Sequence, residues 1–135
     1  MIVVSLIFLC INSNAQETVT KFSFESGGRG FEESIIVRLD STFYHKHSLF
    51  KKINIDSVFL TEKGTWEKLL NSIAPYKLAE LKNLPAPSHY IDIDGAMGSQ
   101  IEIETNLHKY FCGSFDDINP DDKLKLLLGI MLELK

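Results

Sequence analysis

The chain has 135 residues, of which 44% are hydrophobic and 24% are charged. This length suits one domain, and the ordinary globular composition excludes a disordered tail, a collagen-like repeat and a long coiled coil. Fourteen Lys and Arg residues stand against 18 Asp and Glu residues, which gives a net charge of −4. Such a surface lacks the counterion release that drives binding to nucleic acids, so we expect no nucleic-acid partner.

The N-terminal segment has the pattern of an export signal over residues 1–15. An uncharged apolar run over residues 1–11 precedes Ser13 and Ala15, which supply the small residues that signal peptidase requires before its cleavage site. We therefore expect cleavage before Gln16 and a mature protein in the periplasm or outside the cell. The run is shorter than the roughly 20 residues that cross a bilayer as a helix, and we expect no membrane span in the mature chain.

Two alternatives for this segment stay open. Cys10 could be the lipidated first residue of an anchored protein, although the bulky Leu9 stands where lipoprotein processing favours a small side chain. The segment could also form a buried N-terminal strand. Cleavage before Gln16 leaves Cys112 as the single cysteine, so no disulfide within the chain is expected and stability depends on the core.

The first half of the mature chain predicts strands. Segments in which apolar and polar residues alternate are typical of half-buried strands, and an antiparallel meander is the simplest way to join them. The predicted strands cover residues 19–25, 33–39, 43–50 and 53–60.

After residue 60 the spacing of the apolar residues changes from that of a strand to that of a helix. Apolar residues spaced three and four apart, from Trp66 to Ile73, indicate a helix that begins near Thr65 as its cap. Pro75 ends or kinks this helix, and residues 76–84 continue the pattern as a second helical piece.

Three further elements follow. Residues 90–94 and 100–104 form a mirror-like alternation of isoleucines and acids, which predicts a second hairpin with its acids in water, and residues 108–115 predict another strand. The last helix has Asn119 as its predicted cap and Pro120 in its first position. Its apolar residues lie on one stripe, which predicts a face docked on the core. They are Leu124, Leu127, Leu128, Met131 and Leu134.

These elements together predict the fold class. We expect a signal peptide over residues 1–15 and a single α+β domain over residues 16–135. The domain would contain a single antiparallel meander sheet of about seven strands, covered on one face by two helical elements, with the C-terminal helix as the main cover.

His45 and His47 are the most specific chemical signal in the sequence. Residues two apart on a strand share a face, so both imidazoles could bind one metal ion, with zinc as the natural candidate. A third ligand would have to come from elsewhere in the chain. The alternative is a half-buried pair on an edge strand, where nearby lysines resist aggregation.

Charge is unevenly distributed along the chain. Residues 92–122 contain eight acids and one lysine, a net of −7, whereas residues 41–91 contain seven lysines and four acids, a net of +3. The acids of the second hairpin define a negative surface that would attract a basic protein partner. These contact candidates are Asp92, Asp94, Glu102 and Glu104. The alternative is a face that only keeps the protein in solution.

Several short motifs resemble those of small, uncharacterised exported proteins of Bacteroidetes-type bacteria. They are Phe22-x-Phe24, Gly27-Gly28-Arg29-Gly30-Phe31, Trp66-x-x-Leu69, Ala86-Pro87-Ser88, Asp94-Gly95-Ala96, and Phe115-Asp116 ahead of Asn119-Pro120. The segment Asn14-Ala15-Gln16 is similar to the cleavage regions of their signal peptides. The resemblance implies an exported location and this architecture. It implies no catalytic residues.

Three functions fit these observations, and a binding protein is favoured over an enzyme. The first is an exported, non-catalytic binding protein, such as an inhibitor or immunity-type factor with an acidic contact surface. The second is a small metal-assisted hydrolase that uses His45 and His47. The third is a carrier that holds an apolar ligand between the sheet and the helices.

Overall fold

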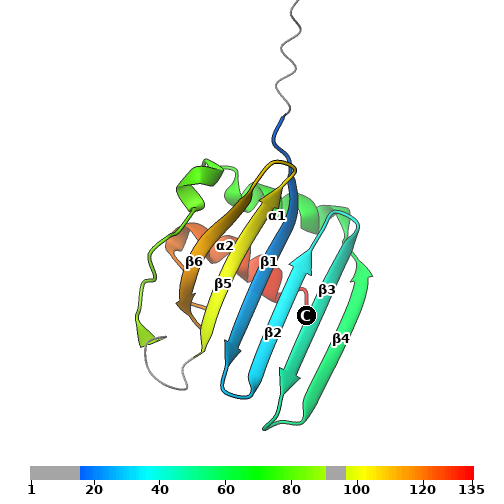
Figure 1. The fold of residues 1–135 in the computed structure, drawn as a ribbon. Coiled ribbons are helices and arrows are strands. Elements are labelled where there is room, and N and C mark those ends of the chain that lie inside the picture. Colours follow the sequence, from blue (N-terminus) through cyan, green and yellow to red (C-terminus); the bar gives the residue numbers. More distant parts are fainter. Residues whose placement is uncertain (1–15, 91–96) are drawn as a thin grey trace, which may run out of the picture.

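The computed structural model of the protein describes residues 16–90 and 97–135. They form one antiparallel sheet of six strands with two α-helices on one face (Figure 1). This arrangement confirms the predicted α+β class. The elements are β1 (Val19–Gly28), β2 (Phe31–Val37), β3 (Ser41–Ser48), β4 (Ile53–Leu60), α1 (Lys63–Ile73), the 3-10 helix η1 (Leu78–Leu81), β5 (Gly98–Thr105), β6 (Lys109–Asp116) and α2 (Asp122–Leu132).

The strands lie in the order β4-β3-β2-β1-β5-β6. The first four strands form a meander, and the β5–β6 hairpin adds to the edge of β1 that the meander leaves open. The six strands of the described residues compare with about seven expected. The additional predicted strand, over residues 90–94, falls almost entirely on residues 91–96, which lie outside the described residues.

The core lies between the sheet and the helices. Register pairs Phe22 of β1 with Val37 of β2 and Ile103 of β5, and all three side chains are fully buried. From the other side, Leu69 of α1 and Leu127 of α2 close the core. We call the side of the sheet that faces the helices its inner face and the opposite side its outer face. Side chains alternate between these faces along each strand.

Both predicted helix caps are wrong, that of α1 by three residues and that of α2 by two. The α1 helix begins at Lys63, because the Glu62 carbonyl accepts a bond from the Trp66 amide (3.1 Å) ahead of the predicted cap at Thr65. In α2 the cap is Asp121, whose carboxylate accepts a hydrogen bond from the backbone N–H of Lys123 (3.0 Å).

The predicted cap of α2, Asn119, has another role. Its backbone N–H donates to the carbonyl of Asp116 (2.8 Å) and its side chain donates to Ser88 (3.1 Å), so it closes a turn after β6. The predicted docked stripe is confirmed. Four of its residues are buried, and Leu134 is half-buried. The buried residues are Leu124, Leu127, Leu128 and Met131.

The predicted helical piece over residues 76–84 is also shorter than expected. Only Leu78–Leu81 is helical, and it is a 3-10 helix. The chain then turns at Asn83, which has a positive φ of 52°. From there the backbone N–H groups of Asn83 and Leu84 donate to the carbonyls of Phe111 (2.8 Å) and Cys112 (3.2 Å) on β6. The segment therefore runs along the edge of β6 instead of continuing as a helix.

Residues next to the predicted cleavage site are held by the β5–β6 turn. The backbone N–H of Thr18 donates to the Asn106 side chain (2.8 Å), and the Glu17 carboxylate accepts from the Tyr110 hydroxyl (2.6 Å). The predicted signal peptide itself, residues 1–15, lies outside the described residues. Among the helices of residues 16–90 and 97–135, none has the length and apolar character needed to cross a membrane.

Candidate functional site

His45 lies on the outer face in the middle of β3. Its Nδ1 is 2.6 Å from a carboxylate oxygen of Asp56, which is directly opposite on β4. Its Nε2 is 3.0 Å from a carboxylate oxygen of Glu32, diagonally placed on β2. Carboxylates accept hydrogen bonds, so both ring nitrogens donate when the imidazole is protonated. The hydrogen bonds that the ring donates to Asp56 and, to a smaller extent, to Glu32 raise the pKa of His45 above 6.5.

His47 shares the outer face with His45, as the spacing predicted, and both rings are half-buried. A metal ion between them would have to displace a carboxylate from His45, since both nitrogens of that ring are engaged. Across residues 16–90 and 97–135, no group of three or more His, Cys, Asp or Glu side chains has the arrangement of a metal site. The pair therefore shares a face, and the described residues supply no third ligand.

A hollow of about 450 Å³ lies over the ends of β1, β2 and β5. Most of its lining side chains point away from the helices, including Glu25, Glu32 and Gln100. Small residues form its floor, because side chains no larger than a hydroxymethyl group leave space between the longer ones. These floor residues are Gly27, Ser34, Gly98 and Ser114.

A second, smaller hollow of about 110 Å³ continues the first along the outer face and shares Glu25 and Gln100 with it. Glu102 and Lys21 belong to its lining. The Gln100 amide donates to the Glu25 carboxylate (2.9 Å) between the two hollows. We call the two hollows together the outer groove. Three carboxylates of the outer face surround it, those of Glu25, Glu32 and Glu102. Glu33 also lines the first hollow, but it is buried and paired with lysines.

The structure places two of the four predicted acidic contact residues beside the outer groove. Glu102 lines the groove, and Glu104 forms an ion pair with Lys21 (2.9 Å). The hydrogen bond from Lys21 lowers the pKa of Glu104, so this carboxylate is held by its own chain. Asp92 and Asp94 lie outside the described residues.

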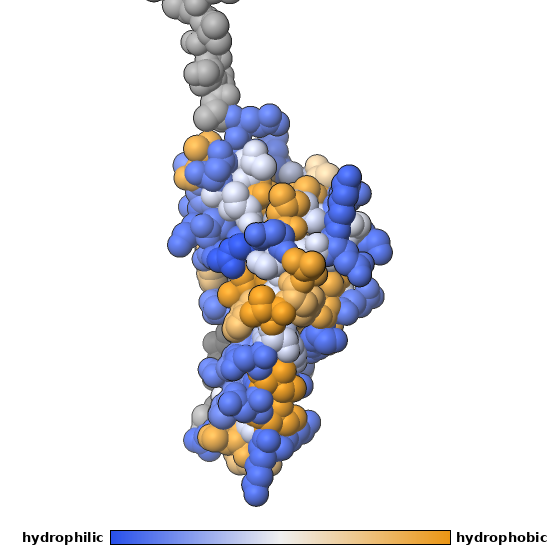
Figure 2. Space-filling view, turned by 90° about the vertical axis from the view of Figure 1, so that its right-hand side faces the viewer, coloured by the Kyte–Doolittle hydropathy of each residue, from blue (hydrophilic) through white to orange (hydrophobic). Residues whose placement is uncertain are grey.

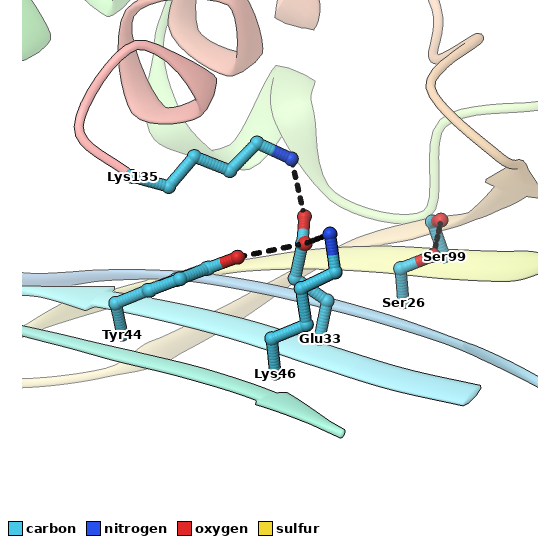
Figure 3. A network of polar contacts seen from close by, with 6 residues as sticks. All are labelled: Ser26, Glu33, Tyr44, Lys46, Ser99 and Lys135. Carbon is cyan, nitrogen blue, oxygen red and sulfur yellow. Dashed lines mark hydrogen bonds and ion pairs between the residues drawn. The ribbon is translucent and has the colours of Figure 1, made fainter. Parts of the chain in front are cut away.

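The inner face below α2 has a buried polar network (Figure 3). The Glu33 carboxylate accepts a hydrogen bond from the Tyr44 hydroxyl (3.1 Å) and lies 2.7 Å from Nζ of Lys135 and 3.7 Å from Nζ of Lys46. Burial, together with the nearby Glu33 carboxylate, raises the pKa of Tyr44 to about 12. The network compensates the burial of Glu33 and joins the end of the chain to the sheet, so we assign it to the fold.

Cys112, the cysteine of the described residues, is also part of the fold. It is buried on β6, and burial raises the pKa of its thiol to about 12. Such a thiol is almost wholly protonated at neutral pH and is a poor nucleophile.

Glu25 and Glu32 were not predicted from the sequence as site residues. The signal was present, because Glu25 alternates with the core residues Phe24 and Ser26 and therefore had to face away from the core. The pairing of β1 with β5 could not be predicted from the sequence. This pairing brings Glu25 next to Gln100 and Glu102, which are 75 or more residues away along the chain.

Comparison with known proteins adds no family to this description: no protein-family model matches the chain, and no curated protein matches it.

Proposed function

We propose that the chain is an exported, non-catalytic binding protein, of the inhibitor or immunity type, that contacts a basic partner through the outer groove. The observation that carries this proposal is an acidic hollow on the face of the sheet that the helices leave uncovered. Three carboxylates of the groove come from three adjacent strands, so a rigid sheet fixes their spacing. A rigid, preformed surface loses little entropy when a partner binds.

The charges of the groove fit a basic segment. Glu25 and Glu32 are exposed and Glu102 is half-buried. Glu32 is paired with His45, and the lining lysine, Lys21, is paired with Glu104, so Glu25 and Glu102 carry most of the remaining negative charge. Lysine or arginine side chains of a partner would meet carboxylates at the rim and small residues at the floor. Attraction of this kind raises the association rate and weakens as salt is added.

The test compares two double variants of equal charge. Glu25→Gln with Glu102→Gln removes two negative charges from the groove, and Glu67→Gln with Glu80→Gln removes the same charge from exposed positions of α1 and η1. A lysine-rich peptide serves as the probe, and its binding is followed by chemical-shift changes of backbone amides at low and high salt. We expect the groove variant to bind about tenfold more weakly and the control to bind as the parent does.

Affinity capture of proteins from the native cell envelope then tests whether a basic protein binds through the groove. The parent protein and the control should retain the same basic protein, and the groove variant should not. Equal loss of peptide binding in both double variants, or shifts confined to residues away from β1, β2 and β5, would contradict the proposal.

A further inference from the structure

Among the described residues, β4 is an edge strand with one unpaired side. It forms a continuous antiparallel ladder with β3 from Ile53 to Leu60, and in the strand order of residues 16–90 and 97–135 its single neighbour is β3. In Figure 1 it lies at the outer margin of the sheet, remote from β6.

The register identifies the free backbone groups of this edge. The Thr61 amide donates to the Asp40 carbonyl (3.3 Å), which continues the β3–β4 ladder by one pair. In an antiparallel ladder, hydrogen-bonded pairs alternate with pairs that are not hydrogen-bonded. The odd-numbered residues of β4 therefore bond to β3. The N–H and C=O groups that point away from β3 belong to Asn54, Asp56, Val58 and Leu60.

Apolar side chains accompany these free groups on both faces. Val58 and Leu60 on the outer face are 72% and 83% exposed, and Ile55 and Phe59 on the inner face are also exposed. Figure 2 looks onto this side of the molecule and shows apolar side chains gathered there. Such an edge is a ready template for another strand.

The usual protections of an edge strand are missing from β4. It contains no proline and no lysine, and its register shows no bulge. Asp56 is its one charged residue, and His45 of the neighbouring strand holds that carboxylate. One charged residue among eight is a weak obstacle to a second strand whose register keeps it away from other acids.

We propose that β4 pairs antiparallel with β4 of a second copy of this chain, about a two-fold axis at Ser57. In this register Ile55 lies opposite Phe59 of the second copy on the inner face, and Asp56 lies opposite Val58 on the outer face. Beyond the strand ends, Lys52 comes opposite Glu62 of the second copy, and the symmetry repeats that pair. Both side chains are exposed.

The charges select this register over its neighbours. A shift by two residues in one direction places Asp56 opposite Asp56 of the second copy, and like charges directly opposite each other are destabilising. A shift in the other direction places Glu62 opposite Asn54 and leaves Lys52 without an acid. The chosen register is the one in which both ends carry opposite charges.

The pairing extends the proposal of a binding protein without depending on it. Because the two-fold axis is perpendicular to the sheet, the helices of both copies lie on one face of a continuous sheet. The two outer grooves then lie on the other face. A partner with two basic segments would meet both.

Two substitutions at one position test the register. Val58→Asp places an acid opposite Asp56 of the second copy, twice in the dimer, whereas Val58→Lys places a cation there. Sedimentation equilibrium should show a dimer for the parent protein and for Val58→Lys. For Val58→Asp we expect association to be weakened at least about tenfold. Leu126→Asp, an equally polar change at an exposed position of α2, is the matched control and should leave the dimer intact.

A cross-link supplies an independent measurement. In the proposed register two Ser57 residues face each other as a pair that is not hydrogen-bonded, with Cα atoms about 4.5 Å apart, close enough for a disulfide. Ser57→Cys should therefore form a disulfide-linked dimer on mild oxidation. Asn54→Cys should not, because two Asn54 residues are separated by roughly 20 Å along the strands. Buried Cys112 is present in both variants.

Several results would overturn the proposal. These are a monomer at every concentration reached, a dimer that Val58→Asp leaves unchanged, loss of the dimer in both Val58 variants, or equal cross-linking of Ser57→Cys and Asn54→Cys. A monomeric chain that instead binds a strand of another protein at β4 would also overturn it.

Discussion

The two edges of the sheet differ in how their backbone groups are satisfied. At β6 the segment after η1 runs beside the strand, and the amides of Asn83 and Leu84 donate to two β6 carbonyls. Gly113 interrupts the regular ladder of β6 with a positive φ of 98°, and the register shifts at this point. At β4 the ladder is regular, and apolar side chains flank the free edge.

This difference limits what the sheet can assemble into. A sheet with two open edges can add copies at both and grow into a fibre, whereas one open edge allows a closed two-fold pair. The covered β6 edge therefore makes the open β4 edge tolerable. Substitutions that uncover β6 should therefore cost more stability than substitutions confined to β4.

The largest effect is expected at Gly113. An alanine there would take a backbone conformation that costs about 1–2 kcal/mol for an L-residue, and its Cβ would overlap the backbone of Leu84. Relief of the overlap would move the covering segment and break its bonds to β6. We expect Gly113→Ala to lower the free energy of unfolding by about 3–5 kcal/mol in urea titrations.

Gly129 is the matched control for this substitution. It lies in the exposed part of α2, where an added Cβ meets nothing within 4 Å. Gly129→Ala should raise stability by about 0.5–1 kcal/mol, because alanine favours helix. Equal stability of the two alanine variants would show that the close contact between Gly113 and the backbone of Leu84 does not contribute to stability.

The next largest effect is the difference in stability between two leucine-to-alanine variants, one near each edge of the sheet. Leu81 of η1 is fully buried in the core on the β6 side, whereas Leu60 of β4 is exposed. Leu81→Ala should lower the free energy of unfolding by about 2–4 kcal/mol. Leu60→Ala should change it by less than about 0.5 kcal/mol. A large loss for Leu60→Ala at monomer concentrations would mean that β4 packs more tightly within one chain than its exposure indicates.

Most of the strands could be predicted because their side chains alternate between core and water. The segment 53–60 was predicted with its observed bounds, although β4 is exposed on both faces, since β-branched and aromatic residues favour extended backbone in either setting. Helix starts were less predictable. A polar residue two or three positions away could also cap, and which one does so depends on how the chain leaves the preceding strand.

The edges and the outer groove could not be predicted, since both depend on which strands are neighbours. Alternation shows that Glu25 and Glu102 leave the core, but it does not show that β1 and β5 are adjacent. The 3-10 turn and its hydrogen bonds to β6 are likewise set by tertiary contacts. His45 and His47 were correctly placed on one face, whereas the carboxylates beside His45 come from β2 and β4 and depend on register.

The smallest effect concerns how β4 is held to its own sheet. His45 connects Asp56 of β4 with Glu32 of β2 across β3, and its pKa in the folded protein is raised above the unfolded value of 6.5. A raised pKa means that the folded state binds the proton more tightly than the unfolded state. The stabilisation is therefore complete below about pH 6.5 and is lost as the pH rises through the raised pKa.

The expected size is at most about 1 kcal/mol, because both carboxylates are largely exposed and solvent screens them. Urea unfolding near pH 6 and near pH 9 should show this loss in the parent protein, and His45→Gln should reduce it. Added salt should reduce it as well, since exposed charges are screened. An unchanged pH dependence in His45→Gln would assign the loss to other groups. The β4 edge would then be attached to the sheet through the β3 ladder and its apolar contacts, without help from this bridge.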